Sequence, residues 1–341
     1  MSYRPKQVLV TGGAGFIGAN YVRHLLAADP QVRIVNLDLL TYAGSLDNLA
    51  GLPHDGRHTF VHGDIADQPL VESVLRDHAI DTIVHFAAES HVDRSITGPG
   101  EFVRTNVVGT WTLLEAARQY WLNEQRLSAV DAQAQRRFHH IGTDEVFGTL
   151  GPDDATFSER TPYAPNSPYS SSKAGSDHLV RAYFHTYGLP VSTTHCSNNY
   201  GPYQHGEKFI PTVVRSCLEG TDIPVYGNGS NIRDWLYVED HCRAIEAVIG
   251  RGTVGETYNV GGCNEWTNID IVALICALMD RHRPDGAPHA RLVTFVTDRP
   301  GHDWRYAIDA AKMMRELQWR PIESFETGIA KTLEWLVQKQ S

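Results

Sequence analysis

Two short groups of residues near the middle of the sequence carry side chains suited to proton transfer. Thr143, Asp144 and Glu145 directly follow an apolar run that reads as a strand, and Tyr169 and Lys173 stand four residues apart where a helical pattern opens. Residues four apart share one face of a helix. A phenol is too weak an acid to serve as a base at neutral pH unless a nearby cation stabilises the phenolate, and Lys173 can supply that cation. The two groups therefore predict redox chemistry coupled to acid/base chemistry.

A glycine-rich turn near the N-terminus predicts which cofactor takes part in the redox step. Residues 7–11 read as a buried parallel strand, Gly12, Gly15 and Gly18 follow, and a helical pattern then begins. In this context, glycines let a pyrophosphate approach the backbone at a helix N-terminus. The next strand ends in Asp38, about 20 residues past the last glycine, where a carboxylate binds a ribose diol and repels a 2′-phosphate. The pattern predicts NAD rather than NADP; the plainer alternative for Asp38 is a helix N-cap.

Taken singly, the two proton-transfer groups also have plainer interpretations. An Asp-Glu pair after a strand is commonly a solvated turn, and Tyr-x-x-x-Lys on a helix is commonly a surface pair. The glycine turn and the acid of the NAD-binding type, found in the same strand order, favour the catalytic interpretation of both groups.

Strand-like and helical patterns alternate along the chain, which predicts an α/β fold built on a Rossmann-type doubly wound parallel sheet. Strand-like runs occur at 7–11, 34–38, 59–61, 82–88, 138–142, 191–196 and 257–260, and helical patterns at 101–119, 169–187, 208–220 and 269–279. After Cys196 the regular alternation of strand-like and helical patterns gives way to polar turns and short elements. We expect an NAD-binding Rossmann domain over 1–199, with a returning segment near 234–260. A smaller α/β C-terminal lobe that binds substrate would then comprise 200–233 and 261–341.

The composition argues against several classes of partner and site. The chain has 341 residues and a formal net charge of −10, whereas binding to nucleic acid or an acidic membrane requires a basic surface. No apolar run reaches the roughly 18 residues of a membrane span, and the N-terminus has no secretory pattern. The 5 cysteines stand far apart with no C-x-x-C pair, which is typical of reduced thiols in the cytoplasm. No cluster has metal-ligand spacing, so no metal is predicted.

With these motifs, the chain resembles the extended short-chain dehydrogenase/reductase superfamily and, within it, most closely the family of dTDP-glucose 4,6-dehydratases. The resemblance covers nearly the whole chain: the glycine turn, residues 37–44, 91–95 and 143–146, Tyr169 with Lys173, and 298–303. The acidic pair is the most specific part, because related 4-epimerases usually lack it and related decarboxylases and GDP-mannose dehydratases tend to have Ser before the glutamate. The sequence departs from the family at Gly142, usually Ser, and at Phe147, usually Tyr.

The resemblance implies a redox-neutral dehydration of a nucleotide diphosphate sugar, with dTDP-glucose as the expected substrate and dTDP-4-keto-6-deoxyglucose as the product. Tyr169 would take the proton of the 4-hydroxyl while NAD takes the hydride of C4, and Thr143 would hold the 4-oxygen. Glu145 would then remove the C5 proton, and Asp144 would protonate the departing C6 hydroxyl before the hydride returns to C6. An aspartate that acts as an acid near pH 7 needs a raised pKa, which a neighbouring carboxylate in a closed site would help to supply.

Motifs and resemblance together define the expected binding residues. The cofactor set is Gly12, Gly15, Phe16, Ile17, Gly18, Asp38, Leu39, Thr41, Asp64, Ile65, Phe86, Ala87, Ala88, Ser90, Thr105, Tyr169, Lys173 and Asn199. The substrate set is Ser90, Thr143, Asn198, Lys208, Phe209, Pro224, Tyr226, Arg233, Asn268, Asp298, Arg299 and His302. Its cations suit a diphosphate, which the planar fork of Arg binds through two hydrogen bonds. For Arg299 and His302 a plain surface loop is the alternative, and His91 and His195 are expected to be packing groups.

Two other functions stay open. A UDP-sugar 4-epimerase or decarboxylase would share the NAD site and Tyr169 but would not need Asp144 as an acid. An NAD-sensing regulator on the same fold could lose Thr143, Tyr169 and Lys173 freely, so their joint presence argues against it. The resemblance also implies a homodimer that pairs the helices at 101–119 and 170–187.

Overall fold

A seven-stranded parallel sheet forms the larger part of the structure, a computed structural model that describes residues 2–298 and 303–340. Its strand order is β10-β6-β5-β4-β1-β2-β3, and every neighbouring pair is parallel. The strands are β1 (Gln7–Thr11), β2 (Arg33–Asp38), β3 (His58–His62), β4 (Thr82–His85), β5 (Arg137–Thr143), β6 (Val191–Cys196) and β10 (Thr257–Val260). The prediction of a doubly wound parallel sheet is confirmed, and each predicted strand is present.

Helices cover both faces of this sheet. Helices α1 (Phe16–Ala28) and α9 (Val238–Arg251) pack on one face, and α2 (Gln68–Asp77), α5 (Thr110–Ala117) and α7 (Pro168–Tyr187) on the other. Strand β1 shows the reason, because Val8 and Val10 join the cluster under α1 and α9 whereas Leu9 joins the cluster under α2, α5 and α7. Alternate side chains of a strand point to opposite faces, so a continuous apolar run needs cover on both.

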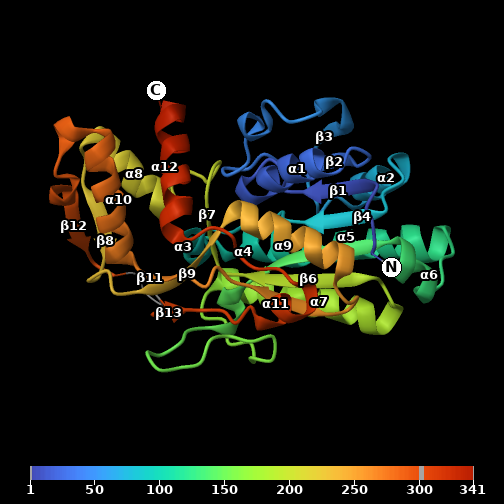
Figure 1. The fold of residues 1–341 in the computed structure, drawn as a ribbon. Helices are drawn as coiled ribbons and strands as arrows, with labels where there is room; N and C mark the ends of the chain where they lie inside the picture. Colours follow the sequence, from blue (N-terminus) through green and yellow to red (C-terminus); the bar gives the residue numbers. More distant parts are fainter. Residues whose placement is uncertain (1, 299–302, 341) are drawn as a thin grey trace.

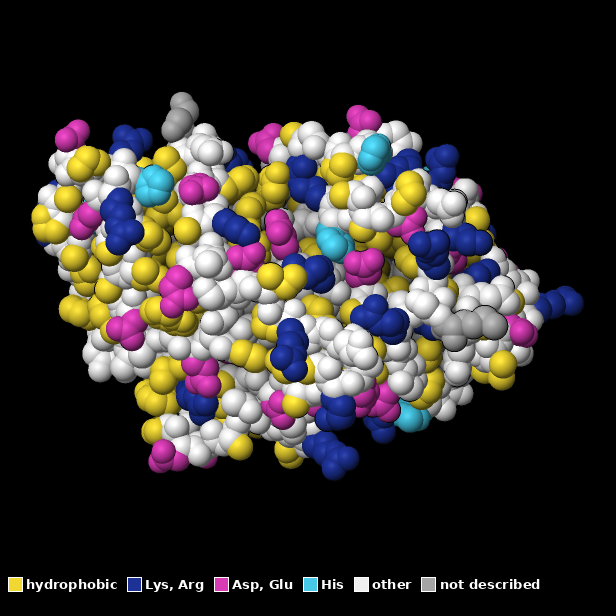
Figure 2. All heavy atoms as spheres, viewed as in Figure 1, with side chains coloured by type: hydrophobic (Ala, Val, Ile, Leu, Met, Phe, Trp, Pro, Cys, Tyr) yellow, Lys and Arg dark blue, Asp and Glu magenta, His cyan; other side chains and the backbone are white. Residues whose placement is uncertain are grey.

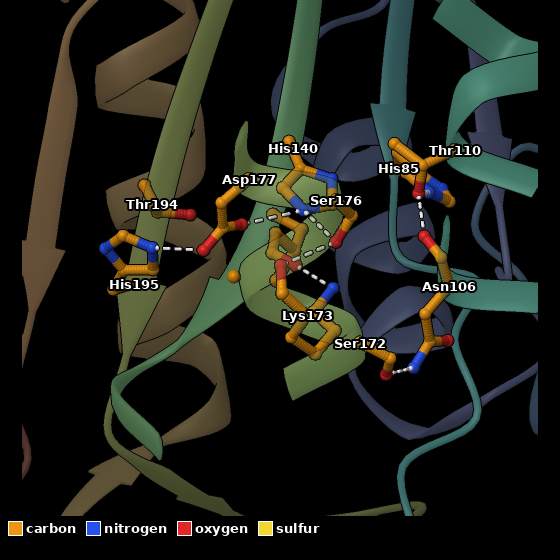
Figure 3. Close-up of polar contacts among 12 residues, drawn as sticks. His85, Asn106, Thr110, His140, Ser172, Lys173, Ser176, Asp177, Thr194 and His195 are labelled. Carbon is orange, nitrogen blue, oxygen red and sulfur yellow. Dashed lines mark hydrogen bonds and ion pairs between the residues drawn. The ribbon is translucent and has the colours of Figure 1, made fainter. Parts of the chain in front are cut away.

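The predicted helix at 101–119 is longer and irregular in the structure. It runs through α4 (Pro99–Phe102), a π-helical turn η3 (Val103–Gly109), α5 and a second π-helical turn η4 (Arg118–Glu124). Within η3, the amide of Asn106 exchanges hydrogen bonds with the backbone of Glu89 at 2.8 and 3.0 Å and donates to Oγ of Ser172 at 2.8 Å. The wide turn thereby ties the end of β4 to α7, as Figure 3 shows for Asn106 and Ser172.

A second region lies on the left of Figure 1, with its own two small sheets and a separate apolar cluster. One sheet joins β11 (Glu265–Thr267), β9 (Ile232–Tyr237) and β13 (Arg305–Tyr306), with β7 (Asn198–Tyr200) also on β9, and the other joins β12 (Val293–Val296) to β8 (Ile223–Tyr226). The region's longer helices are α8 (Phe209–Glu219), α10 (Asn268–His282) and α12 (Phe325–Gln340). Short helices elsewhere are α3 (Val92–Thr97), α6 (Ala129–Gln135) and α11 (Ala311–Leu317).

The packing divides the chain somewhat differently from the predicted lobes. Strand β9 belongs to a small sheet although most of it falls in the expected returning segment 234–260. Helix α11, expected in the substrate lobe, instead packs on the large sheet, where Met313 and Leu317 share a cluster with Val260. The loop 148–168 is pinned to the segment before α11, because the backbone N–H groups of Leu150 and Phe157 donate to Arg305 and Ala307. The division into two lobes therefore stays a proposal, with 310–319 on the side of the large sheet.

The surface carries charges of both signs. Figure 2 shows Lys and Arg side chains interspersed with Asp and Glu over one face of the molecule. Among residues 2–298 and 303–340, no helix is both long and apolar enough to cross a membrane.

Candidate active site

A cleft opens where the strands of the large sheet end at their carboxyl side. It is lined by residues that follow β1, β2, β3, β4, β5 and β6 and by the first turns of α1 and α7. The ligand site of an open α/β sheet lies at this edge. Every residue of the predicted cofactor set lines the cleft, and so do Ser90, Thr143, Asn198 and Lys208 of the predicted substrate set.

The glycine turn has the shape that a dinucleotide requires. A side chain at Gly12, whose φ is +72°, would place its Cβ 2.6 Å from the backbone nitrogen of Ala87, and one at Gly18 would meet the carbonyl of Gly12 at 2.3 Å. The turn therefore lies directly against the end of β4 and against the start of α1, with its backbone open to the cleft. These residues fit a pyrophosphate held at a helix N-terminus.

Asp38 ends β2 at the rim of this turn. Its Oδ2 accepts a hydrogen bond from the backbone N–H of Ala14 at 2.9 Å, and its Oδ1 accepts one from that of Leu40 at 2.8 Å. No helix begins directly after it, so the N-cap alternative does not apply. Each oxygen keeps a further lone pair for a ribose hydroxyl.

The acidic pair follows β5 in a 3₁₀ turn, η5 (Asp144–Phe147). Asp144 is 2% exposed, and its Oδ2 has no hydrogen-bond partner among the described residues. Burial, and next the carboxyl of Glu145, raise the pKa of Asp144 well above its ordinary value. A raised pKa favours the protonated form of the carboxyl, which suits Asp144 to donate a proton to a group placed in the cleft.

Helix α7 presents Tyr169 and Lys173 to the same cleft. It starts with a capping box between Ser167 and Ser170, with Pro168 at its first position. The Nζ group of Lys173 donates a hydrogen bond to the backbone carbonyl of Ile141 at 2.7 Å (Figure 3). Burial, and next Glu145, raise the pKa of the Tyr169 phenol, whereas its hydrogen bond with Thr143 lowers it. A base role for Tyr169 therefore depends on positive charge beside it.

The other predicted substrate residues within 2–298 lie outside the cleft lining. They are Phe209, Pro224, Tyr226, Arg233, Asn268 and Asp298, and they sit at the ends of α8, β8, β9, α10 and β12 in the second region. Arg299 and His302 fall outside the described residues. The structure thus brings the cofactor set together but leaves most of the substrate set apart.

Arg233 is the best-defined of these outlying residues. Its guanidinium donates to the backbone carbonyls of Ile232 at 2.7 Å and Asp303 at 2.9 Å, and it lies 4.3 Å above the ring of Tyr306. Its charge also opposes the rise in the pKa of Asp144 that burial causes. Arg233 therefore lies near enough to the acidic pair to influence it electrostatically.

Three segments meet around the cleft through charged and aromatic groups. The guanidinium of Arg94 lies 3.8 Å over the ring of Tyr42 and 3.3 Å from a carboxylate oxygen of Glu207. His205 packs edge-on to Tyr42 with ring centroids 5.8 Å apart. Nζ of Lys208 donates to the carbonyl of Ser90 at 3.3 Å. Segments after β2, after β4 and before α8 are thus joined.

Several residues that line the cleft were absent from the predicted sets. They are Leu37, Ala43, Gly44, Gly63, Glu89, Ile141, Gly142, Cys196, Ser197, Gln204 and His205. Most are direct neighbours of predicted residues at a strand end, so extending each strand end by one or two positions would have found them. Gln204 and His205 carry no such signal, because they reach the cleft from a loop of the second region.

The two departures from the family, Gly142 and Phe147, meet at a third residue. A Cβ at Gly142 would lie 2.4 Å from Cδ2 of His195, and the ring of Phe147 packs edge-on to His195 with centroids 5.1 Å apart. His195 therefore fills the space that a larger residue at 142 would need. Its expected packing role agrees with this contact, and it also hydrogen-bonds to Asp177.

Fold and cleft together define a class of protein: a dinucleotide-dependent member of the short-chain dehydrogenase/reductase superfamily, with an acidic pair added to its tyrosine and lysine. Comparisons with known proteins narrow this class. A family model described as GDP-mannose 4,6 dehydratase matches residues 9–332. A dTDP-glucose 4,6-dehydratase of Xanthomonas campestris pv. campestris strain B100 is 58% identical over 337 residues, which cover 98% of this chain and 93% of that protein.

Two further comparisons agree. The dTDP-glucose 4,6-dehydratase 1 of Escherichia coli strain K12 is 54% identical over 339 residues, covering 96% of this chain and 92% of that protein. The crystal structure of DesIV, a dTDP-glucose 4,6-dehydratase of Streptomyces venezuelae with NAD and TYD bound, has a TM-score of 0.87, 48% identity and 98% coverage of both chains. The chain belongs to the dTDP-glucose 4,6-dehydratase family.

Proposed function

We propose that this chain dehydrates dTDP-glucose to dTDP-4-keto-6-deoxyglucose, and that Thr143, Asp144, Glu145, Tyr169 and Lys173 carry out the proton transfers. The observation that carries the residue roles is the buried Asp144, whose free oxygen lies beside Glu145 and in the same cleft as Tyr169. An internal elimination needs one acid and one base in different protonation states, and the two carboxyls differ in burial, because Asp144 is buried and Glu145 is only partly buried.

The first step is the removal of the 4-hydroxyl proton. Thr143 holds the 4-oxygen through its hydroxyl, and Tyr169 accepts the proton as phenolate. NAD, when bound, would supply the acceptor for the hydride of C4, the donor that returns it to C6, and a positive charge on the nicotinamide ring. Lys173 supplies the second positive charge from one turn along α7. Together the two charges offset the burial that raises the phenol pKa.

The second step is the loss of water across C5 and C6. The 4-keto group acidifies the C5 proton, because the resulting carbanion is delocalised as an enolate, and Glu145 takes that proton. Asp144 donates its proton to the C6 hydroxyl, which leaves as water. When the hydride returns to C6, Glu145 gives a proton back to C5, which completes the 4-keto-6-deoxy sugar. Tyr169 then holds the proton of the 4-hydroxyl and Asp144 lacks one, and exchange with solvent restores the starting state.

The residues that would hold NAD are those of the glycine turn, Asp38 and the strand-end residues of the predicted cofactor set. For the diphosphate of the sugar, we propose Arg233 and Lys208, with Arg299 as a third cation from the sequence pattern. Asn198 lines the cleft with an Oδ1 that has no partner among the described residues, so it is available to a sugar or ribose hydroxyl.

NMR in D₂O of the purified protein with dTDP-glucose, and no added NAD, tests this function. We expect a 4-keto-6-deoxy product that carries deuterium at C5, because the proton that Glu145 removes exchanges with solvent. The same experiment is run in parallel with UDP-sugars. An epimerised or decarboxylated product there, with dTDP-glucose unchanged, would contradict the dehydration and favour a 4-epimerase or a decarboxylase. No turnover of any sugar nucleotide would favour the NAD-sensing regulator.

We further propose a homodimer in which the helices at 99–124 and α7 pair with those of a second copy. These two elements pack on each other, and they expose Val103, Val108, Trp111 and Tyr187. Neighbouring exposed apolar side chains are characteristic of an interface. Val108→Asp should yield monomers in sedimentation at micromolar concentration, whereas Val130→Asp, at an exposed apolar position on α6, should leave the dimer intact. A monomeric wild-type protein would contradict the proposal.

We place the protein in the cytoplasm. All 5 cysteines are free thiols, which a reducing compartment favours.

A further inference from the structure

A buried carboxylate lies on α7 one turn beyond the catalytic pair, and the proposed mechanism gives it no task. Asp177 follows Lys173 by one turn on the same helix, and its side chain is 5% exposed. It points away from the cleft toward β5 and β6, and Figure 3 shows it between His140 and His195. A buried carboxylate without a role in packing or catalysis is costly to keep, so its partners require an explanation.

Two groups hydrogen-bond to one oxygen of this carboxylate, and a third group from another segment lies within ion-pair distance of the other oxygen. Nε2 of His195 on β6 lies 2.8 Å from Oδ2, the hydroxyl of Tyr163 in the loop before α7 donates to the same oxygen at 3.1 Å, and Nε2 of His140 on β5 lies 3.1 Å from Oδ1. Burial raises the pKa of Asp177, but the contributions of His195 and His140 together outweigh it and lower the pKa below its ordinary value. The arrangement therefore keeps Asp177 ionised inside the protein.

Lys173 is a buried cation, and burial favours its neutral form. Its side chain is 5% exposed, and Nζ donates to the carbonyl of Ile141 at 2.7 Å, a neutral acceptor. Burial lowers the pKa of Lys173, whereas Asp177 and then Cys196 oppose that shift. An ammonium buried in this way loses its proton unless an anion lies near it. Lys173 and Asp177 stand four residues apart on one face of α7, which places the carboxylate where it can act as that anion.

The other titratable groups around Lys173 do not replace this charge. Burial and the charge of Lys173 lower the pKa of His140 to about 4, so its ring is neutral at pH 7. Burial also lowers the pKa of His85 on β4 and raises that of Cys196 on β6, so both are neutral as well. The titratable groups that interact with Lys173 are Asp177, Cys196, His85 and His140, and Tyr169 stands one turn before it on α7.

We propose that Asp177 is a positioning residue for the reaction: held in place by His140, His195 and Tyr163, its buried carboxylate keeps Lys173 protonated beside Tyr169. The inference deepens the proposed function and rests on it, because the charge of Lys173 matters only if Tyr169 acts as a base. Asp177 touches neither substrate nor cofactor, since it does not line the cleft.

A direct measurement of the pKa of Lys173 tests the proposal. The chain has few lysines, namely Lys6, Lys173, Lys208, Lys312, Lys331 and Lys339, so its ¹³C-labelled lysine side chains give a simple NMR spectrum. Lys173→Met identifies the resonance by its loss. In the purified NAD-bound protein we expect Asp177→Asn to lower the pKa of Lys173 by about one pH unit or more. The same variant should lower kcat and leave KM for dTDP-glucose within about twofold.

Asp240→Asn is the matched control. Asp240 is also buried on a helix that packs on the large sheet, and it accepts hydrogen bonds from the backbone of Ile322 and Glu323, far from Lys173 in the sequence and on the opposite face. This variant should lose stability without moving the pKa of Lys173. If Asp177→Asn does not fold, Asp177→Ser leaves space for water among the same donors and removes the same charge.

An unchanged pKa of Lys173 in a folded Asp177 variant would overturn the proposal, and so would an equal shift in Asp240→Asn. Turnover of dTDP-glucose by the wild-type protein, measured in the same buffer, tests the proposed function separately. Its absence would count against the function while the pKa comparison still decides whether Asp177 sets the charge of Lys173.

Discussion

The two halves of the proposed site are built in different ways. At the edge of the large sheet, residues from successive strand ends converge on one cleft, and every residue predicted to bind the cofactor lies in its lining. In the second region, the predicted substrate residues come from α8, β8, β9 and α10, and most of them lie outside that lining. Arg233 illustrates the difference, because a backbone carbonyl 70 residues away holds its guanidinium.

The difference shows what a parallel sheet contributes to a site. The carboxyl ends of its strands meet at one edge whatever their separation in sequence, so the position of a residue at a strand end already locates it. A side chain in the second region is located only by contacts between distant segments. We therefore expect substitutions at the sheet edge to affect the chemical step and substitutions in the second region to affect binding.

The largest effect should come from Tyr169→Phe, which removes the proposed base and keeps the ring. Proton transfer by a positioned side chain contributes roughly 10²–10⁴-fold, so kcat should fall by about 10³-fold. NAD content, measured on the denatured protein by absorbance, should stay close to that of the wild type. Turnover near the wild-type rate in this variant would break the assignment of chemistry to the sheet edge.

Asp144→Asn should slow dehydration by about 10²-fold and stabilise the protein. Burial raises the pKa of Asp144 in the folded state above its unfolded value of about 3.9, so the folded protein binds this proton more tightly than the unfolded chain. The stability that results is present below the unfolded pKa and is lost as pH rises toward the folded pKa. Asn cannot ionise and does not incur this loss. Thermal unfolding at pH 8 should therefore occur at higher temperature in Asp144→Asn, and a lower temperature would contradict the raised pKa.

Arg233→Lys tests the second region. Lysine keeps the charge but loses the planar fork that suits a diphosphate, so KM for dTDP-glucose should rise by about tenfold while kcat changes little. Arg291→Lys, at an exposed arginine of the same region that also donates to backbone carbonyls, should change neither constant. A fall in kcat with unchanged KM would show that Arg233 acts on Asp144 rather than on the substrate.

The smallest effect concerns packing behind the acidic pair. Gly142→Ser should destabilise the protein by about 1–3 kcal/mol, because the new Cβ meets the ring of His195. His195→Asn together with Gly142→Ser should recover much of that loss, which a double-mutant cycle from urea unfolding measures. Simple addition of the two single effects would show that the positions are not coupled.

Prediction from the sequence succeeded where signals were local. The strands of the large sheet, the glycine turn and helix α7 each have a periodic or spaced pattern that spans a few residues. The π-helical turn that positions Asn106 left no such pattern, because its neighbours read as an ordinary helix. Helix α11 also could not be assigned to the large sheet, since its place depends on contacts with α9 and β10. Gln204 and His205 reach the cleft for the same non-local reason.

The close approach of Gly142 and His195 also couples any redesign of these two positions. A Cβ at 142 would lie 2.4 Å from Cδ2 of the imidazole, so a side chain there requires the ring to move or a smaller residue at 195. A library that varies either position alone therefore samples mostly strained combinations, whereas a library that varies both together includes pairs that fit.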